Sequence, residues 1–150
     1  MNPLISTTLA VLLGLAFSAA SLAATPEDAI KYRRGIFAAQ QWNMVTMGEV
    51  VKGKKPYDKS DFLKRAENLA ALSKMFIEGF TVEGAEKGES DAKPEIWFEM
   101  NKFKGGADKL GAEVAKLVQA AQGGDMGVIK TQFGDVQKVC KGCHENFRNK

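Results

Sequence analysis

Apolar side chains recur at alternating steps of four and three residues through much of the C-terminal half of the chain. After Pro94 they fall at Ile96, Met100, Phe103, Ala107, Leu110, Val114, Leu117 and Ala121. A second run repeats the spacing at Ile129, Phe133, Val136, Cys140, Cys143 and Phe147. Because an α-helix turns once every ~3.6 residues, this spacing gathers the apolar residues on one face, which each helix must bury against a partner.

The N-terminal half contains two further helical segments. The first begins at Thr25-Pro26, where a capping hydroxyl precedes a proline in the first helical position, and it ends before Pro56. Its apolar residues stand seven apart, at Ile30, Phe37, Met44 and Val51. A cap at Asp58 or Ser60 begins the second segment. Its apolar residues are Phe62, Ala66, Leu69, Leu72, Phe76 and Phe80.

These four segments predict an all-α fold. Residues 81–94 form the longest loop, which is rich in glycine and charge, and no segment has the period of two that marks a strand. With 150 residues, a hydrophobic fraction of 45% and a net charge of +3, the chain suits one domain without a nucleic-acid partner. We therefore expect an antiparallel four-helix bundle over residues 24–150.

Residues 1–23 have the character of a cleaved signal peptide. An apolar stretch at residues 9–17 precedes small residues that end at Ala23 and Ala24, and the first charged side chain is Glu27. The first three residues include no Lys or Arg, and an uncleaved membrane anchor is the alternative. Since a spanning helix needs about 20 apolar residues, we expect cleavage after Ala23, export to the periplasm and no stable membrane insertion afterwards.

The strongest chemical signal is the run from Cys140 to His144, which has the C-x-x-C-H pattern of covalent haem c attachment. Residues three apart share one face of a helix, so both thiols can reach the two vinyl groups at one edge of a single porphyrin. The histidine that follows is then placed to bind the iron. The motif predicts one haem c per chain, attached through Cys140 and Cys143, with His144 as the metal ligand.

Three other uses of the cysteines explain the motif less well. A structural disulfide leaves the adjacent histidine, the only one in the chain, without a role. A zinc site needs about four ligands, and no second cluster supplies the fourth. A thioredoxin-like redox pair accompanies a βαβ unit, which the spacing does not predict.

The single histidine leaves the sixth iron position open. Because the chain has only one histidine, it cannot supply two histidines to the iron, so the sixth position falls to a methionine, another side chain, water or nothing. The spacing does not choose among the methionines of the mature chain, which are Met44, Met47, Met75, Met100 and Met126.

The chain resembles the class II cytochromes c, and specifically the cytochrome c′ family. The resemblance covers residues 26–150 and rests on the C-x-x-C-H motif in the last helix of a bundle, together with residues 26–33, 55–58, 94–97, 133–136 and 140–148. It implies that Cys140 and Cys143 form the thioethers and that His144 is the proximal ligand. It also implies that Arg148 flanks this histidine and that Arg33 lies near a haem propionate. The alternative for Arg148 is a surface arginine near the C-terminal end of a helix. The alternative for Arg33 is a solvated arginine.

The resemblance gives Phe37 a decisive position. Cytochromes c′ hold an apolar residue there, over the distal haem face, whereas the low-spin branch of the class has its ligating methionine. Phenylalanine cannot coordinate iron, so the resemblance implies five-coordinate, high-spin iron under an apolar lid, with Phe80 as a further aromatic of the pocket. If the alignment is shifted, Met44, two turns further along, becomes the ligand.

Such a site is expected to bind NO and CO, which bind iron strongly without polar help, and to exchange electrons with periplasmic redox partners. The alternative is a low-spin, methionine-ligated electron carrier. We do not expect an enzyme such as a peroxidase, because the sole histidine is already used on the proximal side. The family also implies a homodimer through the first two helices. Trp42, Met47 and Val50 are candidate contacts there and suit the core equally.

Overall fold

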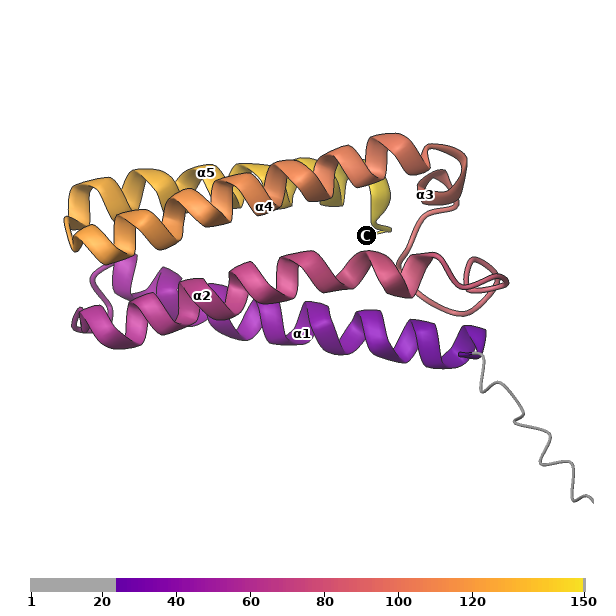
Figure 1. The fold of residues 1–150 in the computed structure, drawn as a ribbon, viewed down its shortest axis with the longest axis horizontal. Coiled ribbons are helices and arrows are strands. Elements are labelled where there is room, and N and C mark those ends of the chain that lie inside the picture. The colour runs from indigo at the N-terminus through magenta and orange to yellow at the C-terminus, as the bar shows by residue number, and fades with distance from the viewer. Residues whose placement is uncertain (1–23, 150) are drawn as a thin grey trace, which may run out of the picture.

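Four long helices run antiparallel in two layers (Figure 1). They are α1 (Pro26–Val51), α2 (Lys59–Met75), α4 (Met100–Gly123) and α5 (Met126–Phe147). A 3-10 turn, η1 (Phe76–Phe80), follows α2, and a single-turn helix, α3 (Glu95–Phe98), precedes α4. The α1–α2 pair forms one layer and the α4–α5 pair the other. The predicted all-α, antiparallel four-helix bundle is confirmed.

This computed structural model describes residues 24–149. The expected signal peptide at residues 1–23 lies outside the described residues, as does Lys150. Among the helices between residues 24 and 149, none is long and apolar enough to cross a membrane.

The helices begin where the capping residues of the sequence place them. Side-chain oxygens of Thr25, Asp58 and Asp125 each accept a hydrogen bond from a backbone N–H in the first turn of α1, α2 and α5. Gly124 ends α4 with φ 82°, a left-handed conformation that glycine adopts at little cost. The two residues Gly124 and Asp125 therefore suffice to end one helix and start the next.

The third helix is not continuous, contrary to the regular spacing that begins at Ile96. The backbone leaves helical geometry at Glu99, with φ −117° and ψ 39°. Ile96 and Phe103 are both buried, one on each side of this break, whereas Phe98 next to it is 85% exposed. The apolar spacing gives no sign of the break, since it reports which residues are buried and not whether one straight helix buries them.

The buried face of α1 differs from the predicted one. Of the four residues spaced seven apart, only Ile30 is buried, and Phe37 is 37% exposed. The buried residues Ala29, Ile36 and Asn43 also stand seven apart, so the buried stripe is the predicted one shifted by one residue toward the N-terminus. Met47 is fully buried in the core, Val50 is half-buried, and Trp42 is 71% exposed. The buried line of α1 is Ala29, Ile30, Arg33, Ile36, Asn43, Met47 and Gly48.

Close contact between η1 and α1 depends on a glycine. A Cβ at Gly79 would stand 2.8 Å from the Cβ of Arg33 and 2.9 Å from the carbonyl oxygen of Ala29. Both distances are shorter than ordinary van der Waals contact, and both involve atoms that cannot rotate away. Only glycine lets η1 lie against α1 at this point.

Substitution of Gly79 by alanine is expected to lower the free energy of unfolding by about 1–3 kcal/mol, because the added methyl group forces the two elements apart. Gly105 of α4 is the matched control, because a Cβ there meets no atom within 4 Å. Gly105→Ala is expected to stabilise the protein by about 0.5–1 kcal/mol. Chemical denaturation of the two haem-loaded variants measures the difference. Equal stabilities would contradict the close contact.

Candidate haem site

The C-x-x-C-H motif lies on the last turns of α5. Cys140 and Cys143 are free, half-buried and packed against the core. Burial raises the pKa of the Cys140 thiol, and burial together with the neighbouring Cys140 raises that of Cys143. Both groups are therefore neutral thiols at pH 7, one helical turn apart on the same face.

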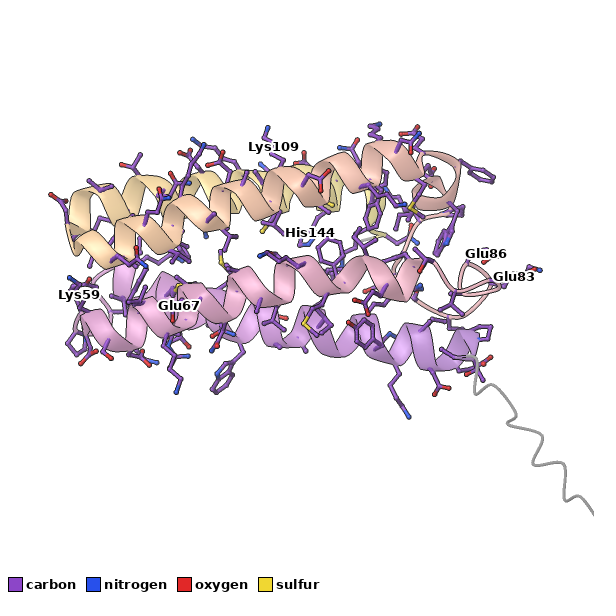
Figure 2. All side chains as sticks on the ribbon, viewed as in Figure 1. Lys59, Glu67, Glu83, Glu86, Lys109 and His144 are labelled. Atoms are coloured by element: carbon purple, nitrogen blue, oxygen red, sulfur yellow. The ribbon has the colours of Figure 1, made fainter. Side chains whose placement is uncertain are left out.

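His144 follows the two cysteines on α5, and its residue is exposed to solvent. Loss of surrounding water and the positive charge of Arg148 both lower the pKa of His144 below its usual value. The neutral ring is the form that binds metals. In Figure 2 the His144 side chain is drawn between the α4–α5 pair and the α1–α2 pair.

The pairing of α1 with α5 places Phe37 opposite His144. A Cβ at Gly48 of α1 would stand 3.4 Å from the Phe133 ring of α5, so these residues lie at the same level of the bundle. The two helices run in opposite directions (Figure 1). Phe37 precedes Gly48 by 11 residues and His144 follows Phe133 by 11, a rise of about 16 Å along each helix. Phe37 and His144 therefore stand at one level on two facing helices.

A second connection fixes this register at the other end of the helices. Arg33 donates to Ser90 Oγ at 2.9 Å, and the carbonyl of the next residue, Asp91, accepts from the backbone N–H of Asn149 at 2.7 Å. The loop thus joins α1 near Arg33 to the end of α5. Phe37 and His144 both lie between this connection and the Gly48–Phe133 contact.

Arg33 is a buried cation rather than a solvated one, with 2% of its surface exposed. It donates to the carbonyls of Gly79 and Ala85 at 2.9 and 3.3 Å, as well as to Ser90. Its guanidinium lies 4.5 Å from the Phe80 ring centre. Burial and the charge of Arg34 lower its pKa. No carboxylate among residues 24–149 forms an ion pair with this guanidinium, which leaves its charge without a counter-ion there.

Arg148 lies on the surface beyond the motif. Its guanidinium pairs with Asp91 at 3.3 Å, and its backbone N–H donates to the carbonyl of His144 at 3.0 Å. Arg148 thereby lies close enough to His144 to influence its pKa, while its side chain also ties the end of α5 to the loop.

Phe37 of α1 and Phe76 and Phe80 of η1 form an aromatic wall. The Phe37 ring lies 5.2 Å from that of Phe76 and 6.2 Å from that of Phe80. Phe80 is buried, and its ring also meets that of Phe103 edge to face, with the ring centres 4.8 Å apart. Sequence reasoning missed Trp97, whose Nε1–H donates to the Phe80 carbonyl at 3.0 Å and whose ring lies 5.5 Å from the Arg33 guanidinium. The sequence feature that could have identified Trp97 is its position directly after Ile96, which is buried.

The donor set fits haem c. The two thiols, one turn apart, match its vinyl groups, and the neutral imidazole beside them matches its iron. The partly exposed aromatic wall matches its ring, and the uncompensated buried cation matches its carboxylates. Among residues 24–149, no three or more His, Cys, Asp or Glu side chains form a cluster that could hold a metal ion.

Comparison with known proteins gives consistent matches. Residues 28–148 match the family model described as Cytochrome C'. Cytochrome c′ of Halomonas halodenitrificans is 38% identical over 130 residues, covering 83% of this chain and 98% of the relative. The solved structure of cytochrome c′ from Shewanella frigidimarina has a TM-score of 0.80 and 39% identity, covering 84% of this chain and 98% of the other.

Two solved structures from Alcaligenes xylosoxidans match as well. One is a nitric oxide complex and the other a carbon monoxide-bound form, both of cytochrome c′ variants. Each has a TM-score of 0.78 and 36% identity, covering 85% of this chain and 98% of the other. On the family match and these identities, the chain belongs to the cytochrome c′ family, whose members carry haem c.

Proposed function

We propose that this c-type haem protein holds five-coordinate, high-spin iron, binds NO and CO at the open position, and transfers electrons. One observation carries the proposal: Phe37, a side chain without a coordinating atom, stands at the level of His144 on the facing helix. A methionine at this level would supply a sixth ligand, and phenylalanine does not.

Different residues would hold different parts of the cofactor. Cys140 and Cys143 would form the thioethers, His144 would bind the iron, and Arg33 would donate to a propionate. The buried guanidinium suits this last role, because it lacks a carboxylate partner among the described residues and lies within the aromatic wall. When bound, haem supplies an iron centre that binds diatomic gases and changes between the ferric and ferrous states.

Phe37, Phe76 and Phe80 favour gas binding over turnover. Apolar rings exclude water and offer no proton, so they support ligands that bind iron without polar help. Peroxide cleavage needs a distal acid–base group, and the single histidine already serves the proximal side. The nitric oxide and carbon monoxide complexes of the Alcaligenes relative agree with this preference.

The low-spin alternative places Met44 on the iron. Met44 lies seven residues beyond Phe37 on α1, which displaces it by about 10 Å along the helix from the level of His144. It is half-buried and packs against the core. This displacement favours the five-coordinate assignment.

We propose a periplasmic location and a homodimer through α1 and α2. The apolar stretch and small residues within positions 1–24 support export. Trp42 and Val45, on the outer face of α1, are 71% and 54% exposed and supply apolar surface for a second copy. Met47 takes no part in this surface, since it is buried in the core.

Absorption spectra of the purified protein, ferric and ferrous, test the proposed coordination. We expect a broad ferrous Soret band without a sharp α-band, which shifts when CO or NO is added, because the sixth position is open. Sharp α and β bands that CO leaves unchanged would mean a protein sixth ligand and would contradict the proposal.

The substitution Phe37→Met is expected to convert the iron to a six-coordinate, low-spin form, because it places a thioether at the level of His144. The ferrous spectrum should gain a sharp α-band, and CO should bind more weakly in titrations. Met44→Leu is the matched control and should leave the wild-type spectrum unchanged. A spectrum altered by Met44→Leu instead would identify Met44 as the ligand.

Replacement of the buried arginine, Arg33→Leu, is expected to lower the reduction potential, because a nearby cation stabilises the more electron-rich ferrous state. It should also lower the free energy of unfolding by about 1–3 kcal/mol, since buried carbonyls lose their donor. Arg34→Leu removes the same charge from the exposed neighbour, which donates to the carbonyl of Glu89, and should change both quantities less. Potentiometry and chemical denaturation measure them. Equal potentials in the two variants would argue against a propionate near Arg33.

A further inference from the structure

Gln40 of α1 carries a buried amide that the protein does not satisfy. Its Nε2 is inaccessible to solvent and has no hydrogen-bond partner among residues 24–149. A buried donor without a partner costs about 1–3 kcal/mol, so such a group is expected to meet an acceptor in the working protein. The neighbouring Gln41 is exposed, which makes the burial specific to Gln40.

The polar groups nearest along α1 are already engaged. Asn43 Nδ2 donates to the carbonyl of Ala39 at 2.8 Å, and Asn43 Oδ1 accepts from Asn68 at 3.5 Å. Neither contact involves Gln40. The acceptor for Gln40 is therefore sought outside the protein's own atoms.

The position of Gln40 indicates which acceptor it meets. Gln40 follows Phe37 by three residues, which puts the two side chains on adjacent turns of one face of α1. In the register set by Gly48 and Phe133, Gln40 stands level with Lys141, between the two attachment cysteines. Its amide thus faces the same side of the site as Phe37, across from His144.

A propionate is the wrong acceptor for this amide. Arg33, the residue suited to a carboxylate, precedes Phe37 by four residues, whereas Gln40 follows it by three. The two polar side chains therefore lie on opposite sides of Phe37 along the helix. Arg33 lies nearer the N-terminus of α1, and Gln40 lies nearer its middle.

We propose that Gln40 Nε2 donates a hydrogen bond to the outer atom of a diatomic ligand on the iron. This inference rests on the proposed function, because it requires an open sixth position on the α1 side. It makes the pocket less uniformly apolar than Phe37, Phe76 and Phe80 suggest. Gln40 then adjusts the choice among diatomic gases, in favour of those whose outer atom accepts a hydrogen bond.

The test compares the ferrous CO complexes of the haem-loaded wild type, Gln40→Leu and Gln41→Leu. Leucine matches glutamine in size and carries neither a donor nor a group that binds iron. Donation to the CO oxygen weakens the C–O bond, so Gln40→Leu is expected to raise the C–O stretching frequency in the infrared spectrum. Its CO affinity should fall roughly two- to threefold, the effect of a weak hydrogen bond. Gln41→Leu, the exposed control, should match the wild type in both.

Thermal unfolding of the CO-free proteins separates this role from a structural one. Gln40→Leu should be at least as stable as the wild type, because it removes an unsatisfied donor. Equal stretching frequencies in all three proteins, or the same shift in Gln41→Leu, would overturn the inference while leaving the proposed function intact. Failure of the wild type to bind CO would overturn both. A loss of stability in Gln40→Leu with an unchanged frequency would identify a structural amide and also overturn the inference.

Discussion

The packing of α1 against α5 is the constraint on which the rest of the site depends. Two connections far apart along these helices hold their register: Gly48 lies against the Phe133 ring, and the loop joins Arg33 to the end of α5. A slip of one turn at either end would move α1 by about 5 Å and put a different side chain across from His144. The chemistry of the site is therefore set by contacts that lie well away from it.

Arg33 connects this register to the loop. A buried cation is stable only when its donors are satisfied, and here the carbonyl of Gly79 in η1, the carbonyl of Ala85 in the loop and the hydroxyl of Ser90 accept its hydrogen bonds. The close approach needed for these bonds explains why Gly79 faces α1. Tyr32 and Arg34, on either side, also bond η1 and the loop, so three successive residues of α1 order the segment that closes this end of the bundle.

Local patterns in the sequence predicted the fold and identified the attachment motif. The features they did not predict depend on contacts between residues far apart in the sequence. The caps at Thr25 and Asp58 act within one turn, so the starts of α1 and α2 were correctly predicted. The burial of Arg33 was not predictable from α1, because its partners lie about 50 residues away in a loop without periodicity. The break at Glu99 was missed for a related reason, since tertiary packing decides whether an apolar face belongs to one helix or two.

Between the two connections, α1 and α5 carry groups that a bound cofactor can cover or satisfy. Phe37 is partly exposed, Gln40 holds an unpaired donor, and both cysteines are half-buried. Each of these features is unfavourable in a finished protein core, yet all occur within two turns of one level of the bundle. The attachment residues of α5 are contiguous in sequence, while α1 supplies the opposite wall. Under the proposed function, single residues of α1 can change the ligand preference while the motif and the bundle stay the same.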